Sequence, residues 1–128
     1  MYTDIAIEHF TNPRNVGVIE DYDGMGEAGD PSCGDYLKIY IKVENDFVKD
    51  IKFKVHGCAG AIASSSMTTE LAKNKPVMAA FAITEGDIIN ALGGLPEEKV
   101  HCSLLGALAL KKAIIDYAKT RNKDDNSL

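Results

Sequence analysis

The sequence contains no tryptophan, few aromatic residues (7%) and only three cysteines among 128 residues. Three cysteines cannot all pair with one another, which argues against a disulfide framework and favours metal binding or thiol chemistry. The net charge is -5, whereas a nucleic-acid-binding protein usually carries a basic excess. The sequence also has no apolar run near the roughly 18 residues that span a bilayer, and its start does not resemble a secretory signal. We therefore expect a cytoplasmic protein that binds neither nucleic acid nor membrane.

The composition that is present fits one globular domain. Hydrophobic residues make up 45% of the chain and charged residues 26%, which is ordinary for a protein with a single buried core. The sequence shows neither an internal repeat nor a linker between domains. We predict one domain over residues 1–121 and a disordered tail over residues 122–128.

Hydrophobic periodicity predicts an α+β fold in which a small antiparallel meander packs against helices. Apolar and polar residues alternate over 37–43 and again over 51–55, and the turn formers of "ENDF" lie between the two runs. A glycine-rich stretch before the first of these strands predicts a loop. Helical spacing or capping signals predict helices over residues 1–10, 60–73, 76–83, 84–92 and 103–121.

All three cysteines fall at the ends of predicted elements. Cys33 precedes the first strand, Cys58 the second helix and Cys102 the last helix. A helix N-terminus favours a thiolate, so we expect the pKa of Cys58 and of Cys102 to be lowered. Asp35 is two residues from Cys33 and points to the same side if the segment is extended.

The histidines and one lysine need separate interpretations. His9 is expected on the apolar face of the first helix, and His56 on the solvent-exposed face of the second strand. His101 adjoins Cys102 and is therefore the better candidate ligand. Lys99 is expected to be a solvated charge. Three separate core cysteines are the ordinary alternative to a site, but their flanking glycines and helix-start positions argue against it.

Thiolates with one imidazole or carboxylate suit either zinc or an iron-sulfur cluster. The cysteines are separated by 24 and 43 residues, which matches neither the paired knuckles of a zinc finger nor a ferredoxin motif. Ligands that come from three distant loops, with a hard carboxylate among soft thiolates, would hold a metal less permanently than four thiolates would. This pattern favours assembly and transfer of a metal centre over electron transport.

Four motifs make the chain resemble the IscU family of iron-sulfur cluster scaffold proteins, which is similar to the N-terminal domain of NifU. They cover most of the chain: "EHFTNPRNVG" at 8–17, "CGD" at 33–35, "FKVHGCAGAIASSSMTTE" at 53–70 and "LPEEKVHC" at 95–102. The resemblance implies a scaffold and carrier rather than an enzyme. Such a scaffold receives sulfur from a cysteine desulfurase of the IscS/NifS type, combines it with iron into a 2Fe-2S cluster, and passes the cluster to apo-proteins.

The resemblance also implies a set of ligands for the cluster or for zinc: Cys33, Asp35, Cys58, His101 and Cys102. By the same resemblance, Asp35 matches the carboxylate that keeps the cluster labile, and Cys102 is expected to be the sulfur acceptor. Whether Asp35 or His101 completes the ligation of the cluster stays open.

Residues 95–99 depart from the family pattern. Members served by a dedicated DnaK-type chaperone carry Leu-Pro-Pro-Val-Lys, whereas this chain has Leu-Pro-Glu-Glu-Lys, in which Lys99 matches the family lysine. We therefore expect weak docking to such a chaperone. The main alternative function is a zinc-bound sulfur acceptor of the SufU branch, which typically has an insertion before the last cysteine and lacks the histidine there. A structural zinc protein is a third interpretation, and a homodimer stays open.

Overall fold

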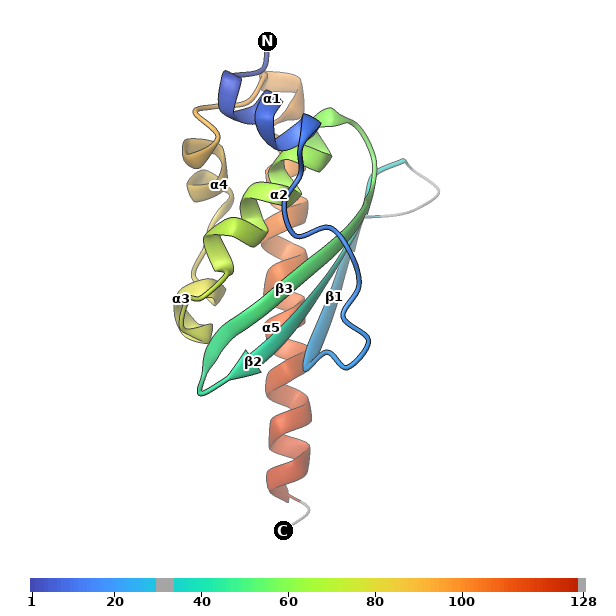
Figure 1. The fold of residues 1–128 in the computed structure, drawn as a ribbon, viewed down its shortest axis with the longest axis vertical. Helices are drawn as coiled ribbons and strands as arrows, with labels where there is room; N and C mark the ends of the chain where they lie inside the picture. The colour runs from blue at the N-terminus through green and yellow to red at the C-terminus, as the bar shows by residue number, and fades with distance from the viewer. Residues whose placement is uncertain (30–33, 127–128) are drawn as a thin grey trace.

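A computed structural model of the chain describes residues 1–29 and 34–126. Figure 1 shows a sheet flanked by helices, and the predicted α+β class is confirmed. In chain order the elements are α1 (Asp4–Thr11), β1 (Gly24–Gly29), β2 (Tyr36–Glu44), β3 (Phe47–His56), α2 (Ala59–Ala72), α3 (Val77–Phe81), α4 (Glu85–Ala91), the 3-10 turn η2 (Glu97–Lys99) and α5 (His101–Asn126).

The sheet is antiparallel, with the strand order β1-β2-β3. The predicted pair of strands is confirmed as the β2-β3 hairpin. Asn45 and Asp46 form its turn with φ angles of 55° and 64°, which is the backbone that a tight two-residue hairpin needs and that Asn and Asp tolerate.

Strand β1 replaces part of the predicted glycine-rich loop, so that prediction was wrong over residues 24–29. Three of its six residues are glycine, a residue depleted in strands, which hid the strand from a propensity argument. The glycines serve packing instead. A Cβ on Gly24 would collide with the carbonyl oxygen of Ala113, and a Cβ on Gly26 with that of Ala109. Helix α5 therefore lies directly against the backbone of β1.

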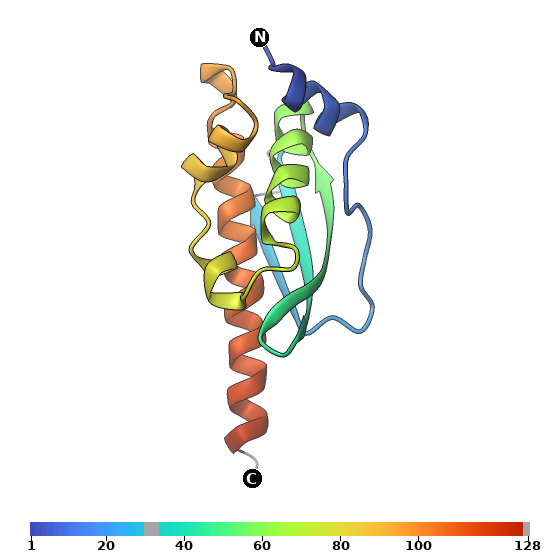
Figure 2. The ribbon, with the colours of Figure 1, turned by 60° about the vertical axis from the view of Figure 1, so that its left-hand side comes forward.

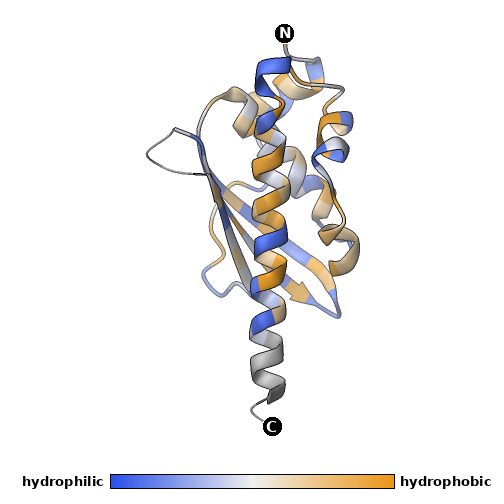
Figure 3. Ribbon diagram, turned by 180° about the vertical axis from the view of Figure 1, so that it is seen from behind, coloured by the Kyte–Doolittle hydropathy of each residue, from blue (hydrophilic) through white to orange (hydrophobic). Residues whose placement is uncertain are grey.

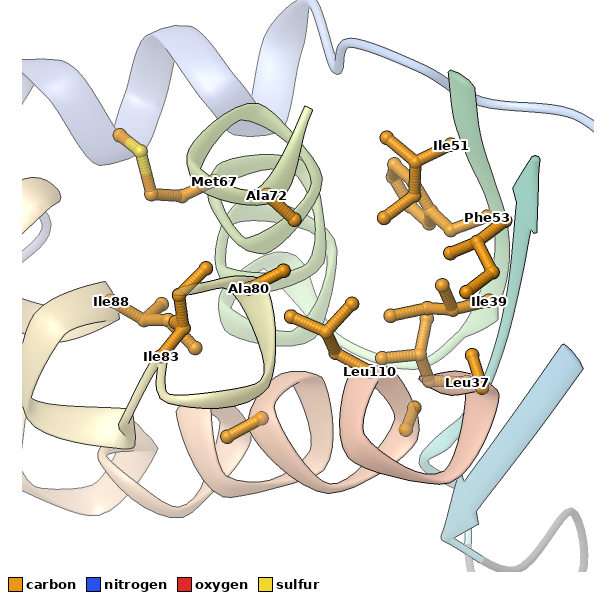
Figure 4. Close-up of a cluster of buried hydrophobic side chains, with 14 of the residues drawn as sticks. Leu37, Ile39, Ile51, Phe53, Met67, Ala72, Ala80, Ile83, Ile88 and Leu110 are labelled. Atoms are coloured by element: carbon orange, nitrogen blue, oxygen red, sulfur yellow. The ribbon is translucent and has the colours of Figure 1, made fainter. Parts of the chain in front are cut away.

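One face of the sheet forms the core together with α2 and α5. The alternation in β2 buries Leu37, Ile39 and Ile41 completely. Figure 4 shows Leu37 and Ile39 among side chains of β3 and the neighbouring helices, namely Ile51, Phe53, Met67, Ala72, Ala80, Ile83, Ile88 and Leu110. On the opposite side of the sheet from α2 and α5, the segment 12–23 runs past the strands (Figure 2).

Helix α2 is buried on most of its surface and is built largely from small residues. Its hydroxyl groups bond to nearby carbonyl oxygens: Thr68 Oγ1 donates to Ser64 O at 2.7 Å. In the part of the chain that the structure describes, no buried side-chain nitrogen or oxygen lacks a hydrogen-bond partner. A Cβ on Gly106 would collide with Thr68 Oγ1, so this glycine lets α5 approach α2. The close packing predicted for this helix is confirmed.

The first helix forms as predicted, but the buried face is narrower than expected. Ala6 and His9 are buried, whereas Ile5 and Phe10 remain 47% and 41% exposed. The inward side of α1 therefore contacts α2 through a small residue and a histidine.

The motif at 8–17 fixes this helix to α2 by polar contacts. His9 Nδ1 lies 2.7 Å from Ser66 Oγ. The backbone N–H of Arg14 donates to the same Ser66 oxygen at 2.9 Å, and Asn15 Nδ2 donates to Thr69 Oγ1 at 3.0 Å. The motif is therefore a structural clamp, and His9 belongs to the buried face, as predicted.

The two short helices form close to where they are predicted. Helix α3 begins at Val77, one residue later than predicted, with Pro76 as its N-cap, and it ends at Phe81 rather than at residue 83. Thr84 and Asp87 form a reciprocal capping box at the start of α4. Gly93 follows that helix with a φ of 76°, a conformation that favours glycine.

The last helix is longer than predicted. It begins at His101 and continues to Asn126, five residues beyond the predicted end at 121. The tail predicted over 122–128 is therefore helical at 122–126, while residues 127–128 lie outside the described residues. Hydrophilic residues interrupt the apolar ones along α5 (Figure 3). Among the described helices, none is both long and apolar enough to cross a membrane.

Candidate metal centre

The ends of three elements meet near the N-terminus of the chain (Figure 1). Asp35 directly precedes β2, Cys58 is the N-cap of α2, and His101 and Cys102 begin α5. We call these four residues the thiol-carboxylate site. Cys102 lies inside the first turn of α5, whereas the sequence predicted it just before the helix.

The site brings donor atoms of three kinds together. One oxygen of Asp35 and the sulfur atoms of Cys58 and Cys102 all lie within 4.8 Å of one another. The two sulfur atoms are 3.8 Å apart. His101 Nε2 lies 3.8 Å from Cys102 Sγ and 3.6 Å from Asp35 Oδ2. Two thiols, a carboxylate and an imidazole are a suitable donor set for zinc or iron.

Four of the five ligands implied by the resemblance therefore converge. The fifth, Cys33, lies outside the described residues. Gly34, which follows it, has a φ of 99° and leads the chain towards Asp35. His56 is exposed on β3, as predicted, and His9 is held by Ser66, so neither belongs to the site.

Two glycines of the "HGCAG" segment make room for the site. A Cβ on Gly57 would lie 2.5 Å from Asp35 Oδ1. A Cβ on Gly60 would lie 3.3 Å from each of three atoms: Cys102 Sγ, Lys99 Cβ and Tyr2 Oη. A side chain at either glycine would therefore press on other residues of the site.

The two described thiols differ strongly in their electrostatic environment. Burial disfavours the Cys58 thiolate, but the N–H groups of Ala61 and Gly60 and the Cys102 thiol outweigh it and lower the pKa of Cys58. For Cys102, burial and the neighbouring Cys58 raise the pKa to about 12. The expected lowering is confirmed for Cys58 and wrong for Cys102. Cys102 is only 1% exposed, and the cost of burying charge exceeds the benefit of its helix-start position.

Tyr2 and Lys99 also lie at the site. Attraction by the Cys58 thiolate is the main cause of the raised pKa of Lys99. Burial, followed by the Cys58 charge, raises the pKa of Tyr2 and keeps its hydroxyl protonated. From the sequence, Tyr2 falls within the helix predicted over residues 1–10 and Lys99 is expected to be a solvated charge, so neither was predicted at the site. The match of Lys99 to the family lysine, in the motif that also holds His101 and Cys102, was a signal for a cation near the site.

Comparison with known proteins identifies the family of the chain. The family described as the NifU-like N terminal domain matches residues 1–124. The iron-sulfur cluster assembly scaffold protein IscU 1 of Archaeoglobus fulgidus is 54% identical over 125 residues, which cover 98% of this chain and 82% of that protein. The scaffold protein IscU of Escherichia coli is 45% identical over 124 residues, which cover 94% of this chain and 96% of that protein.

A solved structure has a similar fold over most of the chain. It is described as that of an iron-sulfur cluster assembly scaffold protein for the SUF system, from Fervidobacterium islandicum AW-1. The TM-score is 0.71 at 25% sequence identity, and the match covers 88% of this chain and 96% of that one.

Proposed function

We propose that the thiol-carboxylate site assembles a 2Fe-2S cluster and passes it to apo-proteins, because this chain belongs to the NifU-like N-terminal domain family. The chain is an iron-sulfur cluster assembly scaffold. The observation that carries the proposal is the convergence of Asp35, Cys58 and Cys102 within 4.8 Å. The cluster is cargo that the scaffold builds and releases, so turnover of a substrate by the scaffold alone is not part of the proposal.

The ligands divide into permanent and exchangeable ones. In this proposal the thiolates of Cys33, Cys58 and Cys102 hold the cluster iron. Asp35 offers a harder oxygen ligand that binds cluster iron less strongly, and its position would be open to a client thiolate. His101 lies within 4 Å of both Asp35 and Cys102, so it can replace the carboxylate during exchange.

The proposed source of sulfur is a cysteine desulfurase that delivers a persulfide to Cys102. The burial of Cys102 adds a condition, because a partner cannot reach a thiol that is 1% exposed. Tyr2 and Lys99 approach the same point above Gly60 as Cys102 does. Movement of these two side chains is therefore part of the proposed transfer. After incubation with the desulfurase, a persulfide mass shift is expected on Cys102.

The remaining partners follow from the same proposal. Clients are apo-proteins that need an iron-sulfur cluster, and a cytoplasmic location would keep the thiols reduced. Docking to a DnaK-type chaperone is expected to be weak because Glu97 and Glu98 are acidic and exposed. The site residues described above come from one chain, so a homodimer is compatible with the proposal but is not required by it.

A zinc-bound sulfur acceptor is the second candidate function. It is favoured by a donor set that zinc also accepts and by the structural similarity to the SUF-system protein. The presence of His101 beside Cys102 favours the scaffold, because the resemblance associates loss of that histidine with the sulfur-acceptor branch. Zinc could still occupy the same residues.

Anaerobic reconstitution tests the proposal. The chain is incubated with ferrous iron, cysteine and a desulfurase, and visible absorption is followed. A coloured protein whose spectrum is that of a 2Fe-2S cluster is expected, and Cys58→Ser should reduce its yield severely. His56→Ala is the matched control, because His56 is exposed and outside the site. A colourless, zinc-loaded chain that still accepts sulfur would favour the second candidate.

A further inference from the structure

The thiols of Cys58 and Cys102 lie close enough to react with each other as well as to bind a metal. Cys58 and Cys102 are 44 residues apart in the sequence, yet their sulfur atoms lie 3.8 Å apart and both are free. Cys58 is the N-cap of α2 and Cys102 lies in the first turn of α5, and these two helices pack against each other. A disulfide needs the two sulfur atoms about 2.05 Å apart, so they would have to approach each other by less than the diameter of a sulfur atom.

We propose that Cys58 reduces a persulfide carried by Cys102 and so releases sulfide inside the site. This inference rests on the proposed function, which supplies the persulfide. It adds an activity to the scaffold, namely internal conversion of sulfane sulfur into the sulfide that a cluster contains.

The proposed step balances without an outside reductant. The thiolate of Cys58 attacks the inner sulfur, Sγ of Cys102, and a Sγ–Sγ bond forms. The bond from Cys102 Sγ to the terminal sulfur breaks, and its electron pair leaves with that sulfur as HS⁻, which keeps the persulfide proton. The terminal sulfur is reduced to sulfide, and the two cysteines are oxidised to a disulfide.

The surroundings favour this direction of attack. Cys58 is partly exposed and is the N-cap of α2, where the helix stabilises negative charge on the attacking sulfur. Among the described site residues it is the one thiol beside Cys102, and neither a carboxylate nor an imidazole can reduce a persulfide. Lys99 carries a positive charge beside Cys58, where the released HS⁻ would form.

The stoichiometry places the step within a reaction sequence. Formation of one Cys58–Cys102 disulfide releases one sulfide ion, whereas a 2Fe-2S cluster needs two. The disulfide also withdraws two proposed ligands from iron. A disulfide reduction, by a dithiol or an electron-transfer protein, must therefore follow each sulfide release before the cluster can be completed.

The test uses the full chain under anaerobic conditions, free of iron and of added thiols. The chain is loaded with persulfide by a desulfurase and cysteine, separated from both by rapid gel filtration, and followed by a sulfide assay and intact mass. We expect release of about one sulfide per loaded chain, together with a product two hydrogens lighter than the reduced chain. Peptide mapping should link Cys58 to Cys102.

Cys58→Ser is the decisive variant. It should keep the persulfide on Cys102 and release sulfide at least about tenfold more slowly, because serine cannot form the disulfide. His56→Ala, two residues away and exposed, should release sulfide as the wild type does. Equal release by Cys58→Ser and wild type would overturn the inference, and so would a disulfide that joins Cys102 to Cys33.

Failure of the inference can be told apart from failure of the proposed function. A stable persulfide on Cys102 without sulfide release overturns the inference alone. If the active desulfurase leaves no persulfide on Cys102 of the Cys58→Ser variant, which cannot convert it into a disulfide, the proposed acceptor role fails. Loading with inorganic polysulfide then still tests the thiol pair, and a Cys102 persulfide that persists under those conditions overturns the inference.

Discussion

Nδ1 of His9 lies 2.7 Å from Oγ of Ser66, so the N-terminal helix is joined to α2 by a buried polar contact. The contact has a consequence for stability because His9 is buried. Burial, and then the charge of Arg14, lower the pKa of His9 below its ordinary value of 6.5. The folded chain therefore disfavours protonation of this imidazole more than the unfolded chain does.

The pH dependence of folding follows from this contact. The contribution of neutral His9 is complete above pH 6.5 and is lost as the pH falls through its lowered pKa in the folded state. The free energy of unfolding, measured by urea titration between pH 5 and pH 7.5, should fall with acidification. His9→Gln should flatten this slope, and His56→Gln should keep it. An unchanged slope in His9→Gln would contradict the assignment.

The two thiols should react at different rates in the metal-free chain. At pH 7.5 we expect iodoacetamide to modify Cys58 at least about a hundredfold faster than Cys102. The reason is that Cys58 has a lowered pKa and partial exposure, whereas Cys102 is buried with a pKa of about 12. Peptide mass spectrometry measures both rates. Faster labelling of Cys102 would show that the site opens more readily than the structure indicates.

Asp35 should make the cluster transferable. Removing the carboxylate by Asp35→Ala leaves the thiolates able to hold a cluster and should slow its transfer to an apo-ferredoxin by about tenfold. The half-life of the 2Fe-2S absorption is compared with and without apo-ferredoxin, anaerobically. Asp21→Ala is the control, since Asp21 pairs with Lys42 at the surface. If Asp35→Ala loses its cluster faster and transfers it as quickly as the wild type, Asp35 stabilises the cluster instead.

The segment 95–99 should decide chaperone docking. The two glutamates occupy an exposed 3-10 turn, where their charges would oppose entry into an apolar groove. A peptide of this segment should stimulate a DnaK-type ATPase weakly, and a peptide with Glu97→Pro and Glu98→Val should stimulate it more. Equal stimulation by the two peptides would show that the acids do not control docking.

A glycine of β1 should be essential for packing. Gly26→Val forces a side chain into the backbone of α5 and should reduce the free energy of unfolding by about 2–4 kcal/mol. Gly86→Ala is the matched control, because this glycine is exposed in α4 and its Cβ would make only an ordinary contact. That change should be neutral or raise stability by up to about 1 kcal/mol. If Gly26→Val leaves the free energy of unfolding unchanged, α5 can shift away from β1.

Local patterns were sufficient for part of this fold and failed at specific places. The alternation around Ile39 and the turn at Asn45 identified β2 and β3, because both depend on neighbours in the chain. Strand β1 was missed because Gly24 and Gly26 make room for residues of α5 that lie more than 80 positions away in the sequence. A position-specific packing requirement of this kind leaves no local period.

The site shows the same division between local and tertiary information. The motifs named Asp35, Cys58, His101 and Cys102, and the structure brings them together. Helix-start position alone gave the wrong direction for the pKa of Cys102, since burial depends on how α2 and α5 pack. Tyr2 was missed for the same reason, because its contact with the site arises only when α1 docks on α2.

The two ends of the chain differ in their distance from the thiol-carboxylate site. Tyr2 reaches Gly60 and Cys102, whereas α5, with its 26 residues, runs about 39 Å away from its start at the site (Figure 1). An affinity tag or fluorophore placed before Tyr2 would crowd the thiol-carboxylate site, which the proposed sulfur donor must reach. The same label attached beyond α5 would leave the site uncovered, so the chain is best immobilised from its C-terminal end.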